Sequence, residues 1–229
     1  MEKTAVVIGA TGFLGTSIVA ELKRLRFVID ETWTSRERPD VRFKASYSSL
    51  PKEIDLAVYA AGTNIICPAH ELTENNWDEV IDINLKGAFL FAQECFDKMK
   101  FRENATIVMI SSINSLHPYP GRLPYSVSKA GIEALVRCLA VEWGPFGISS
   151  HGIRLGHLDG IMKNLKVGAG FHDAIKANTP SGKLVDVKAV GSYIGWLYNH
   201  GAESLSGTVI DFEPAYTINR FPLAQNGKV

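Results

Sequence analysis

The chain has 229 residues, of which 46% are apolar and 21% are charged, and its formal net charge is zero. This length suffices for one domain over residues 1–229 with a full core, and the scattered Lys and Arg indicate no nucleic-acid partner. No apolar run reaches the length of a membrane span, which excludes a membrane partner.

The three cysteines lack metal-ligand spacing, so we expect no metal and regard them as buried thiols of a reducing compartment. The amino terminus does not have the form of a signal peptide. Together these features predict a cytoplasmic protein.

Short apolar runs alternate with amphipathic stretches along the chain. The runs predict seven strands, at or within residues 5–8, 27–34, 41–45, 55–60, 105–110, 148–155 and 207–212. Helical periodicity follows the first strand up to Leu25 and recurs at residues 77–98, 125–143 and 187–198. This alternation predicts an α/β fold, a doubly wound (Rossmann-type) parallel sheet of about seven strands flanked by helices on both faces.

Three evenly spaced glycines, Gly9, Gly12 and Gly15, follow the first predicted strand. Glycine allows a tight turn and a close approach to a ligand, and the helix that follows presents free N–H groups and a positive dipole end. After the first strand of such a sheet, this arrangement favours a pyrophosphate-binding loop over a plain tight turn. The candidate cofactor contacts here are Gly9, Thr11, Gly12, Phe13, Leu14 and Gly15.

The end of the second predicted strand indicates which dinucleotide is bound. An acid at that point holds the ribose 2′-hydroxyl of NAD, whereas a basic residue accommodates the 2′-phosphate of NADP. Ser35 and Arg36 suit the phosphate, and Asp30 comes earlier, within the expected strand. We therefore expect NADP (NADPH) as the preferred cofactor with NAD as the alternative, unless Arg36 is only a solvated loop charge.

Hydroxyl and amine groups follow in two further motifs. Ser111 and Ser112 end the strand predicted at 105–110, and Tyr125 comes thirteen residues after Ser112. Lys129 lies one helical turn beyond Tyr125 on the same face, where its charge favours the phenolate and lowers the tyrosine pKa. Taken singly, the serines are also typical of a turn, and the Tyr–Lys pair is also typical of two partly solvated helix residues.

In order and spacing these motifs resemble those of the short-chain dehydrogenase/reductase family, in its smaller single-domain branch. The resemblance extends over nearly the whole chain and depends on the glycine loop, Ala60-Ala61-Gly62, Asn84 in Ile83-Asn84-Leu85-Lys86-Gly87, Ile110-Ser111-Ser112 and Tyr125-Ser126-Val127-Ser128-Lys129. It implies that Ser112 orients the substrate carbonyl and that Tyr125 is the catalytic acid–base.

The resemblance also implies that Lys129 holds the nicotinamide ribose and lowers the pKa of Tyr125, and that Asn84 holds a water in a proton relay behind the lysine. The further cofactor contacts that it implies are Ala61, Gly62, Tyr125, Lys129, Gly156 and Leu158.

Several positions depart from the family pattern. The glycine spacing resembles that of the extended branch, which includes epimerases and dehydratases of nucleotide sugars. The usual Pro-Gly after the sixth strand is Leu155-Gly156, and Gly160 replaces a threonine that often contacts the nicotinamide. Near the carboxyl end, the usual Asp-Gly-Gly is replaced by Asp211-Phe212-Glu213-Pro214. These changes remove some of the family's contacts to the cofactor but leave the candidate catalytic residues in place.

Residues 157–184 correspond to the substrate-covering segment of the family. Gly168 and Gly170 permit movement, so this segment is expected either to close over the site or to form a surface loop with a short helix. His117, Tyr119 and His157 are candidates for lining the pocket, with solvated loop side chains as the alternative.

The leading hypothesis is an NAD(P)-dependent oxidoreductase that interconverts a carbonyl and a secondary alcohol on a small molecule or a carrier-bound acyl group. Two alternatives are an epimerase or dehydratase with tightly held NAD, and a non-catalytic dinucleotide sensor. The resemblance also implies a homodimer or homotetramer formed through the helices near 75–99 and 125–143. Their apolar residues would serve equally in the core: Leu85, Phe89, Phe91, Ile132, Leu135 and Leu139.

Overall fold

The structure is a computed structural model that describes residues 2–30, 33, 39–160 and 170–219. Its centre is a sheet of six parallel strands in the order β2-β1-β3-β4-β5-β6. The strands are β1 (Lys3–Ile8), β2 (Phe27–Ile29), β3 (Leu56–Tyr59), β4 (Thr106–Ser112), β5 (Ser149–Leu155) and β6 (Val209–Phe212). The chain order reverses between β1 and β3, which makes this the switch point where doubly wound sheets bind ligands.

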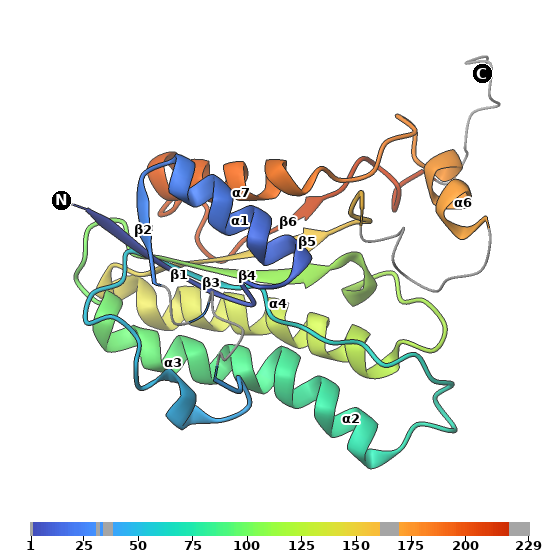
Figure 1. Cartoon of the computed structure of the whole chain (residues 1–229), viewed down its shortest axis with the longest axis horizontal. Helices are drawn as coiled ribbons and strands as arrows, with labels where there is room; N and C mark the ends of the chain where they lie inside the picture. Colours follow the sequence, from blue (N-terminus) through green and yellow to red (C-terminus); the bar gives the residue numbers. More distant parts are fainter. Residues whose placement is uncertain (1, 31–32, 34–38, 161–169, 220–229) are drawn as a thin grey trace.

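Helices cover both faces of the sheet, so the predicted fold class is confirmed (Figure 1). On one face lie α1 (Phe13–Arg24) and α7 (Val187–Trp196), and on the other lie α2 (Glu74–Ile81), α3 (Gly87–Met99) and α4 (Leu123–Trp143). A further helix, α6 (Phe171–Asn178), lies beyond the end of the sheet where the strands finish. No helix in the described part of the chain combines the length and apolar character needed to cross a membrane.

Five short helical segments complete the described elements. They are η2 (Lys44–Tyr47), η3 (Asp82–Lys86), η4 (Ile113–Ser115), η5 (Gly144–Phe146) and η6 (Leu197–Gly201). Of these, η3 and η6 are π-helical and the others are 3-10 turns.

The sheet lies between two apolar cores because its central strands are buried on both faces. Along β1, Val6 and Ile8 belong to the core under α3 and α4, whereas Ala5 and Val7 belong to the core under α1 and α7. A continuous apolar run is therefore what this strand requires. With both faces covered, the polar motifs that follow the strands meet at the carboxyl edge of the sheet.

The strand predicted at residues 41–45 is wrong, and the described sheet has six strands instead of about seven. The main-chain oxygen of Val41 accepts a hydrogen bond from Tyr47 Oη at 2.8 Å, and Arg42 turns back onto the carboxylate of Asp40. A turn and η2 therefore occupy this segment. The Tyr47 ring stacks on buried Trp33 at 5.3 Å, and both belong to the core that contains Val6 and Ile8 of β1.

The helix predicted at residues 77–98 is divided into α2, the π-helical η3 and α3. The Tyr59 hydroxyl donates to the main-chain oxygen of Ile83 within η3. A π-helical turn can form where a side chain bonds to the helix backbone, and such turns are frequent at functional sites. The apolar residues proposed for an oligomer interface belong to or pack against the core, except Phe89, which is 45% exposed.

Candidate active site

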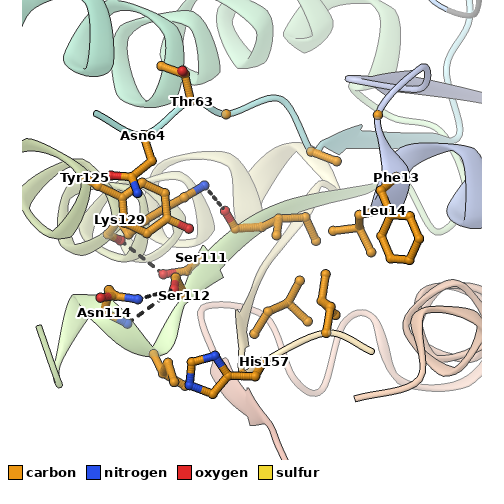
Figure 2. A pocket seen from close by; sticks show the side chains of 18 of the residues that line it. Phe13, Leu14, Thr63, Asn64, Ser111, Ser112, Asn114, Tyr125, Lys129 and His157 are labelled. Atoms are coloured by element: carbon orange, nitrogen blue, oxygen red, sulfur yellow. Dashed lines mark hydrogen bonds between the residues drawn. The ribbon is translucent and has the colours of Figure 1, made fainter. Parts of the chain in front are cut away.

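A cavity of about 400 Å³ lies at the carboxyl edge of the sheet (Figure 2). The predicted site residues that line it are Gly9, Gly12, Phe13, Leu14, Gly15, Gly62, Ser112, Tyr125, Lys129, Gly156 and Leu158. Thr11 and Ala61 line an adjoining hollow that shares Gly9, Gly12 and Gly62 with the cavity. Asn84 is fully buried behind it, and Ser35 and Arg36 lie outside the residues that the structure describes.

The glycine loop has the geometry of an anion cradle. Gly9 has a φ of +86°, and a Cβ at this position would lie 2.6 Å from the main-chain nitrogen of Ala61, so only glycine fits between β1 and β3. Helix α1 begins after Gly12 without a side-chain cap. Its first N–H groups therefore remain available to a ligand, and the positive end of the helix dipole favours a pyrophosphate there.

Gly62 lies against Asn84 and Lys129, beside the candidate catalytic residues. A Cβ on Gly62 would lie 3.4 Å from Asn84 Oδ1 and 3.5 Å from Lys129 Nζ, so both polar groups approach the backbone of Gly62 closely. Asn84 Oδ1 accepts from the main-chain nitrogen of Thr63 at 2.8 Å, and its Nδ2 donates to the Thr63 oxygen and to Ser128 Oγ. Asn84 therefore ties the loop after β3 to helix α4.

The Ser112 hydroxyl is oriented by Asn114. The main-chain nitrogen and Nδ2 of Asn114 both donate to Ser112 Oγ, each at 3.2 Å. Because its lone pairs are taken, the hydroxyl can use its own proton as a donor. Ser112 lies at the end of β4 beside Tyr125, where a substrate oxygen would meet both hydroxyl groups (Figure 2).

Tyr125 and Lys129 lie on one face of α4, with Lys129 Nζ 5.7 Å from the centre of the tyrosine ring. Burial raises the pKa of Tyr125 above its usual value, and Ser112 and the charge of Arg122 oppose this rise. The Lys129 ammonium donates to the main-chain oxygen of Ile110 at 2.8 Å, and the effect of its charge on the Tyr125 pKa stays a prediction. Burial also lowers the pKa of Lys129 to about 8.

A buried ion pair behind the serines was not predicted from the sequence. Arg154 on β5 donates to Glu133 on α4 at 2.7 Å and also pairs with Asp211. The Glu133 carboxylate further accepts hydrogen bonds from Ser111 and Ser115. Buried charges require partners, so a glutamate one turn beyond Lys129 on an inward helix face was the available signal.

His157 lines the cavity and contacts Tyr119, which lines a separate hollow, and Tyr216 of the carboxyl-terminal segment. Tyr119 Oη lies 3.0 Å from His157 Nε2 and donates to Tyr216 Oη at 2.9 Å. Burial, reinforced by the charge of Arg122, lowers the pKa of His157 to about 4. A neutral imidazole in this network is a structural part of the wall.

One departure from the family pattern has a local explanation. Gly160 has a φ of +94°, and a Cβ there would lie 2.7 Å from the ring of Phe13. The Phe13 ring therefore occupies the position where a larger side chain would project.

Of the segment 157–184, residues 157–160 and 170–184 are described, and Phe171 at the start of α6 lines the cavity.

The site combines a pyrophosphate cradle at a switch point with a serine, a tyrosine and a lysine in the same cavity. This combination defines a dinucleotide-dependent oxidoreductase of the Rossmann type. A family model described as enoyl-(acyl carrier protein) reductase matches residues 35–213. The chain belongs to the short-chain dehydrogenase/reductase family and is by class an NAD(P)-dependent oxidoreductase that acts on a small-molecule substrate.

Individual relatives agree with this assignment. The chain is 29% identical over 160 residues to a peroxisomal 2,4-dienoyl-CoA reductase of Saccharomyces cerevisiae, a match that covers 69% of this chain and 54% of the yeast protein. It is 22% identical to a tropinone reductase homolog of Arabidopsis thaliana, over 97% of this chain and 95% of that protein. The yeast match thus spans about half the length of that relative.

The fold is also that of a solved gluconate 5-dehydrogenase from Burkholderia cenocepacia J2315 in complex with NADP and tartrate. The TM-score is 0.85 at 20% identity, over 95% of this chain and 96% of that one. This likeness concerns the fold. None of these comparisons favours the epimerase, dehydratase or sensor alternatives.

Proposed function

We propose that the chain interconverts a carbonyl and a secondary alcohol, with NADP as the preferred cofactor and Tyr125 as the acid–base. The observation that carries this proposal is that Ser112, Tyr125 and Lys129 reach the same cavity as the glycine loop. A nicotinamide dinucleotide bound there supplies a hydride for reduction or accepts one for oxidation.

The hydroxyl groups of Ser112 and Tyr125 would act together on the substrate oxygen. During reduction the carbonyl carbon gains a hydride, the Tyr125 O–H bond breaks, and its proton moves to the oxygen to complete the alcohol. Ser112 donates a hydrogen bond to the same oxygen and stabilises its developing negative charge. The raised pKa of Tyr125 keeps this group protonated at neutral pH, as a proton donor must be.

Lys129 and Asn84 would return the proton to Tyr125. Lys129 Nζ and Asn84 Oδ1 both approach Gly62, because a Cβ built on that glycine would lie 3.5 Å from the first and 3.4 Å from the second. A water that bonds to both groups would complete a proton relay. We propose that this water passes a proton from solvent toward Lys129, which also holds the nicotinamide ribose. This role explains why a charged side chain is kept in a buried position.

The preference for NADP is proposed from Ser35 and Arg36. It is supported by Asp30, whose main-chain nitrogen donates to Ala5 at 3.0 Å and therefore continues the ladder of β2 with β1. Ala5 lies four residues before Gly9. Asp30, which bonds to Ala5, therefore lies before the level of the glycine loop, where the ribose would bind. A basic residue further along the chain is then the nearer candidate for the 2′-phosphate.

The arrangement of the whole chain is part of the same proposal. Residues 1–229 would form one catalytic domain, with residues 157–184 covering the substrate. The position of Phe171 in the cavity wall supports the covering role. A homodimer or homotetramer, a carrier-bound acyl substrate and a cytoplasmic location stay predictions.

The test is the oxidation of NADPH by a panel of ketones and aldehydes, with the wild-type chain and Tyr125→Phe. At least one carbonyl compound should be reduced, and Tyr125→Phe should lower kcat by a factor of about 10² to 10⁴ while NADPH binding is kept. Tyr193→Phe, in a half-buried tyrosine of α7, is the matched control. Full activity of Tyr125→Phe would refute the acid–base role, and a wild type inactive on the whole panel would favour a sensor.

A further inference from the structure

Arg122 brings a guanidinium group to the substrate side of the cavity. It immediately precedes α4 and lines the cavity together with Tyr125, which lies one helical turn further along. Arg122 also borders a second hollow lined by Asn114, Tyr119 and Leu123, into which no glycine-loop residue projects. Its position is therefore remote from the cofactor cradle at Phe13 and Leu14, which lies across the cavity from Tyr125 (Figure 2).

The charge of Arg122 has no carboxylate partner among the described residues. Arg122 forms no ion pair there, and its guanidinium lies over the face of the Tyr119 ring at 5.8 Å. By contrast, Arg42, Arg102 and Arg154 each pair with at least one carboxylate. An arginine that has no carboxylate partner at the wall of a cavity can bind a carboxylate or phosphate group of a ligand.

The charged side chains that line the described part of the cavity are cationic. Its described lining contains two cationic side chains, Arg122 and Lys129, and no carboxylate. The Lys129 ammonium is already bonded to the main-chain oxygen of Ile110. The field of Arg122 reaches both walls, since its charge lowers the pKa of Tyr125 on one side and of His157 on the other. A substrate that enters this space gains energy if it carries a negative charge.

We propose that Arg122 is an anion subsite and that the substrates are carbonyl compounds with a carboxylate or phosphate group close to the reacting carbon. This inference rests on the proposed function, because Tyr125 defines where the reacting carbonyl lies. The planar guanidinium suits either oxyanion, with two parallel N–H···O bonds. Binding of that group would fix the distance and direction of the carbonyl relative to Tyr125.

The test measures binding without turnover, in the NADPH complex of Tyr125→Phe. Calorimetry compares three charged and neutral pairs: 3-oxobutanoate with its methyl ester, 4-oxopentanoate with its methyl ester, and dihydroxyacetone phosphate with dihydroxyacetone. In at least one pair the anion should bind about tenfold tighter or more, as a charge-assisted bidentate contact allows. Whether a carboxylate pair or the phosphate pair responds identifies the group.

Substitutions at Arg122 supply the second part of the test. Arg122→Leu should remove the discrimination between anion and neutral partner, and Arg122→Lys should keep part of it. Arg137→Leu, at an exposed arginine of the same helix, should leave it unchanged, and NADPH affinity should be equal in all variants. Equal binding of the partners in every pair, or discrimination that survives Arg122→Leu, would overturn the subsite. If the discrimination is seen but the wild type reduces no carbonyl, the subsite stands and the proposed reaction fails.

Discussion

Lys129 Nζ donates a hydrogen bond to the main-chain oxygen of Ile110 at 2.8 Å, beneath the ring of Tyr125. The contact is buried and joins α4 to β4 near the point where the strand enters the cavity. It holds the ammonium in place before any ligand arrives. Such preorganisation would lower the entropic cost of binding the ribose and the relay water that we propose for this nitrogen.

Replacing Lys129 with methionine removes this donor and its charge. We expect Lys129→Met to lower kcat by a factor of about 10² or more and to weaken NADPH binding, because in the proposed mechanism one group serves both the proton relay and the ribose. Steady-state kinetics and calorimetric titration with NADPH measure the two effects. Lys86→Met, at an exposed lysine of η3, is the control, and unchanged NADPH binding in Lys129→Met would contradict the ribose contact.

The pH dependence of reduction should follow Lys129. Burial lowers the pKa of Lys129 to about 8 and raises that of Tyr125, so below pH 8 both groups carry their protons. We expect kcat/KM for reduction to be level from pH 6 to about 7 and to fall by up to about tenfold per pH unit above 8, as the lysine loses its charge. The profile of Lys129→Met should lack this inflection. A reduction rate that rises through pH 8 would rule out the assignment.

The central sheet and the cavity could be predicted because they depend on local patterns. The buried run Ala5–Val6–Val7–Ile8 and the glycines that follow it specify a strand, a tight turn and a helix start without reference to distant residues. Ser112, Tyr125 and Lys129 were found for a similar reason. Each stands at a fixed place relative to the end of a strand or the start of a helix.

What the sequence did not predict depends on contacts between distant segments. The alternation of Val41, Phe43 and Ala45 suits a strand, but the Tyr47 hydroxyl takes the Val41 oxygen and a turn forms instead. Glu133 and Arg154 meet only when α4 packs on β5. No pattern within either segment predicts that its charged side chain will meet one of opposite charge from the other segment.

The choice between NADP and NAD should depend on Arg36. We expect Arg36→Ala to lower the ratio of kcat/KM for NADPH over NADH by about tenfold or more, the value of a charge-assisted hydrogen bond to phosphate. The measurement needs only one accepted carbonyl substrate at saturation. Arg137→Ala should leave the ratio unchanged, and an unchanged ratio in Arg36→Ala would mean that Arg36 is a solvated loop charge.

His151 should make the protein lose stability in acid. His151 is 2% exposed on β5, and burial lowers its pKa from 6.5 to about 4. Between these pH values the unfolded chain binds a proton that the folded chain refuses, so the free energy of unfolding falls as pH decreases. The slope from this group is about 1.4 kcal/mol per pH unit. Urea unfolding at pH 6, 5.5 and 5 should show a slope shallower by about this amount in His151→Leu. His70→Gln, at a residue with an 82% exposed side chain, is the control and should keep the wild-type slope.

Removal of one partner of the Glu133–Arg154 ion pair should lower the free energy of unfolding strongly. Replacement of both partners should lower it much less. Their side chains are 5% and 10% exposed, so Arg154→Met leaves a carboxylate buried without its main partner. We expect a loss of about 3–5 kcal/mol in the free energy of unfolding for that variant, measured by urea denaturation. The double variant Glu133→Met/Arg154→Met should lose clearly less than the sum of the two single variants, because it leaves no unpaired charge in the core. Lys86→Met, which breaks an exposed ion pair with Asp82, should cost less than about 1 kcal/mol. Strict additivity in the double variant would show that the two charges do not depend on each other.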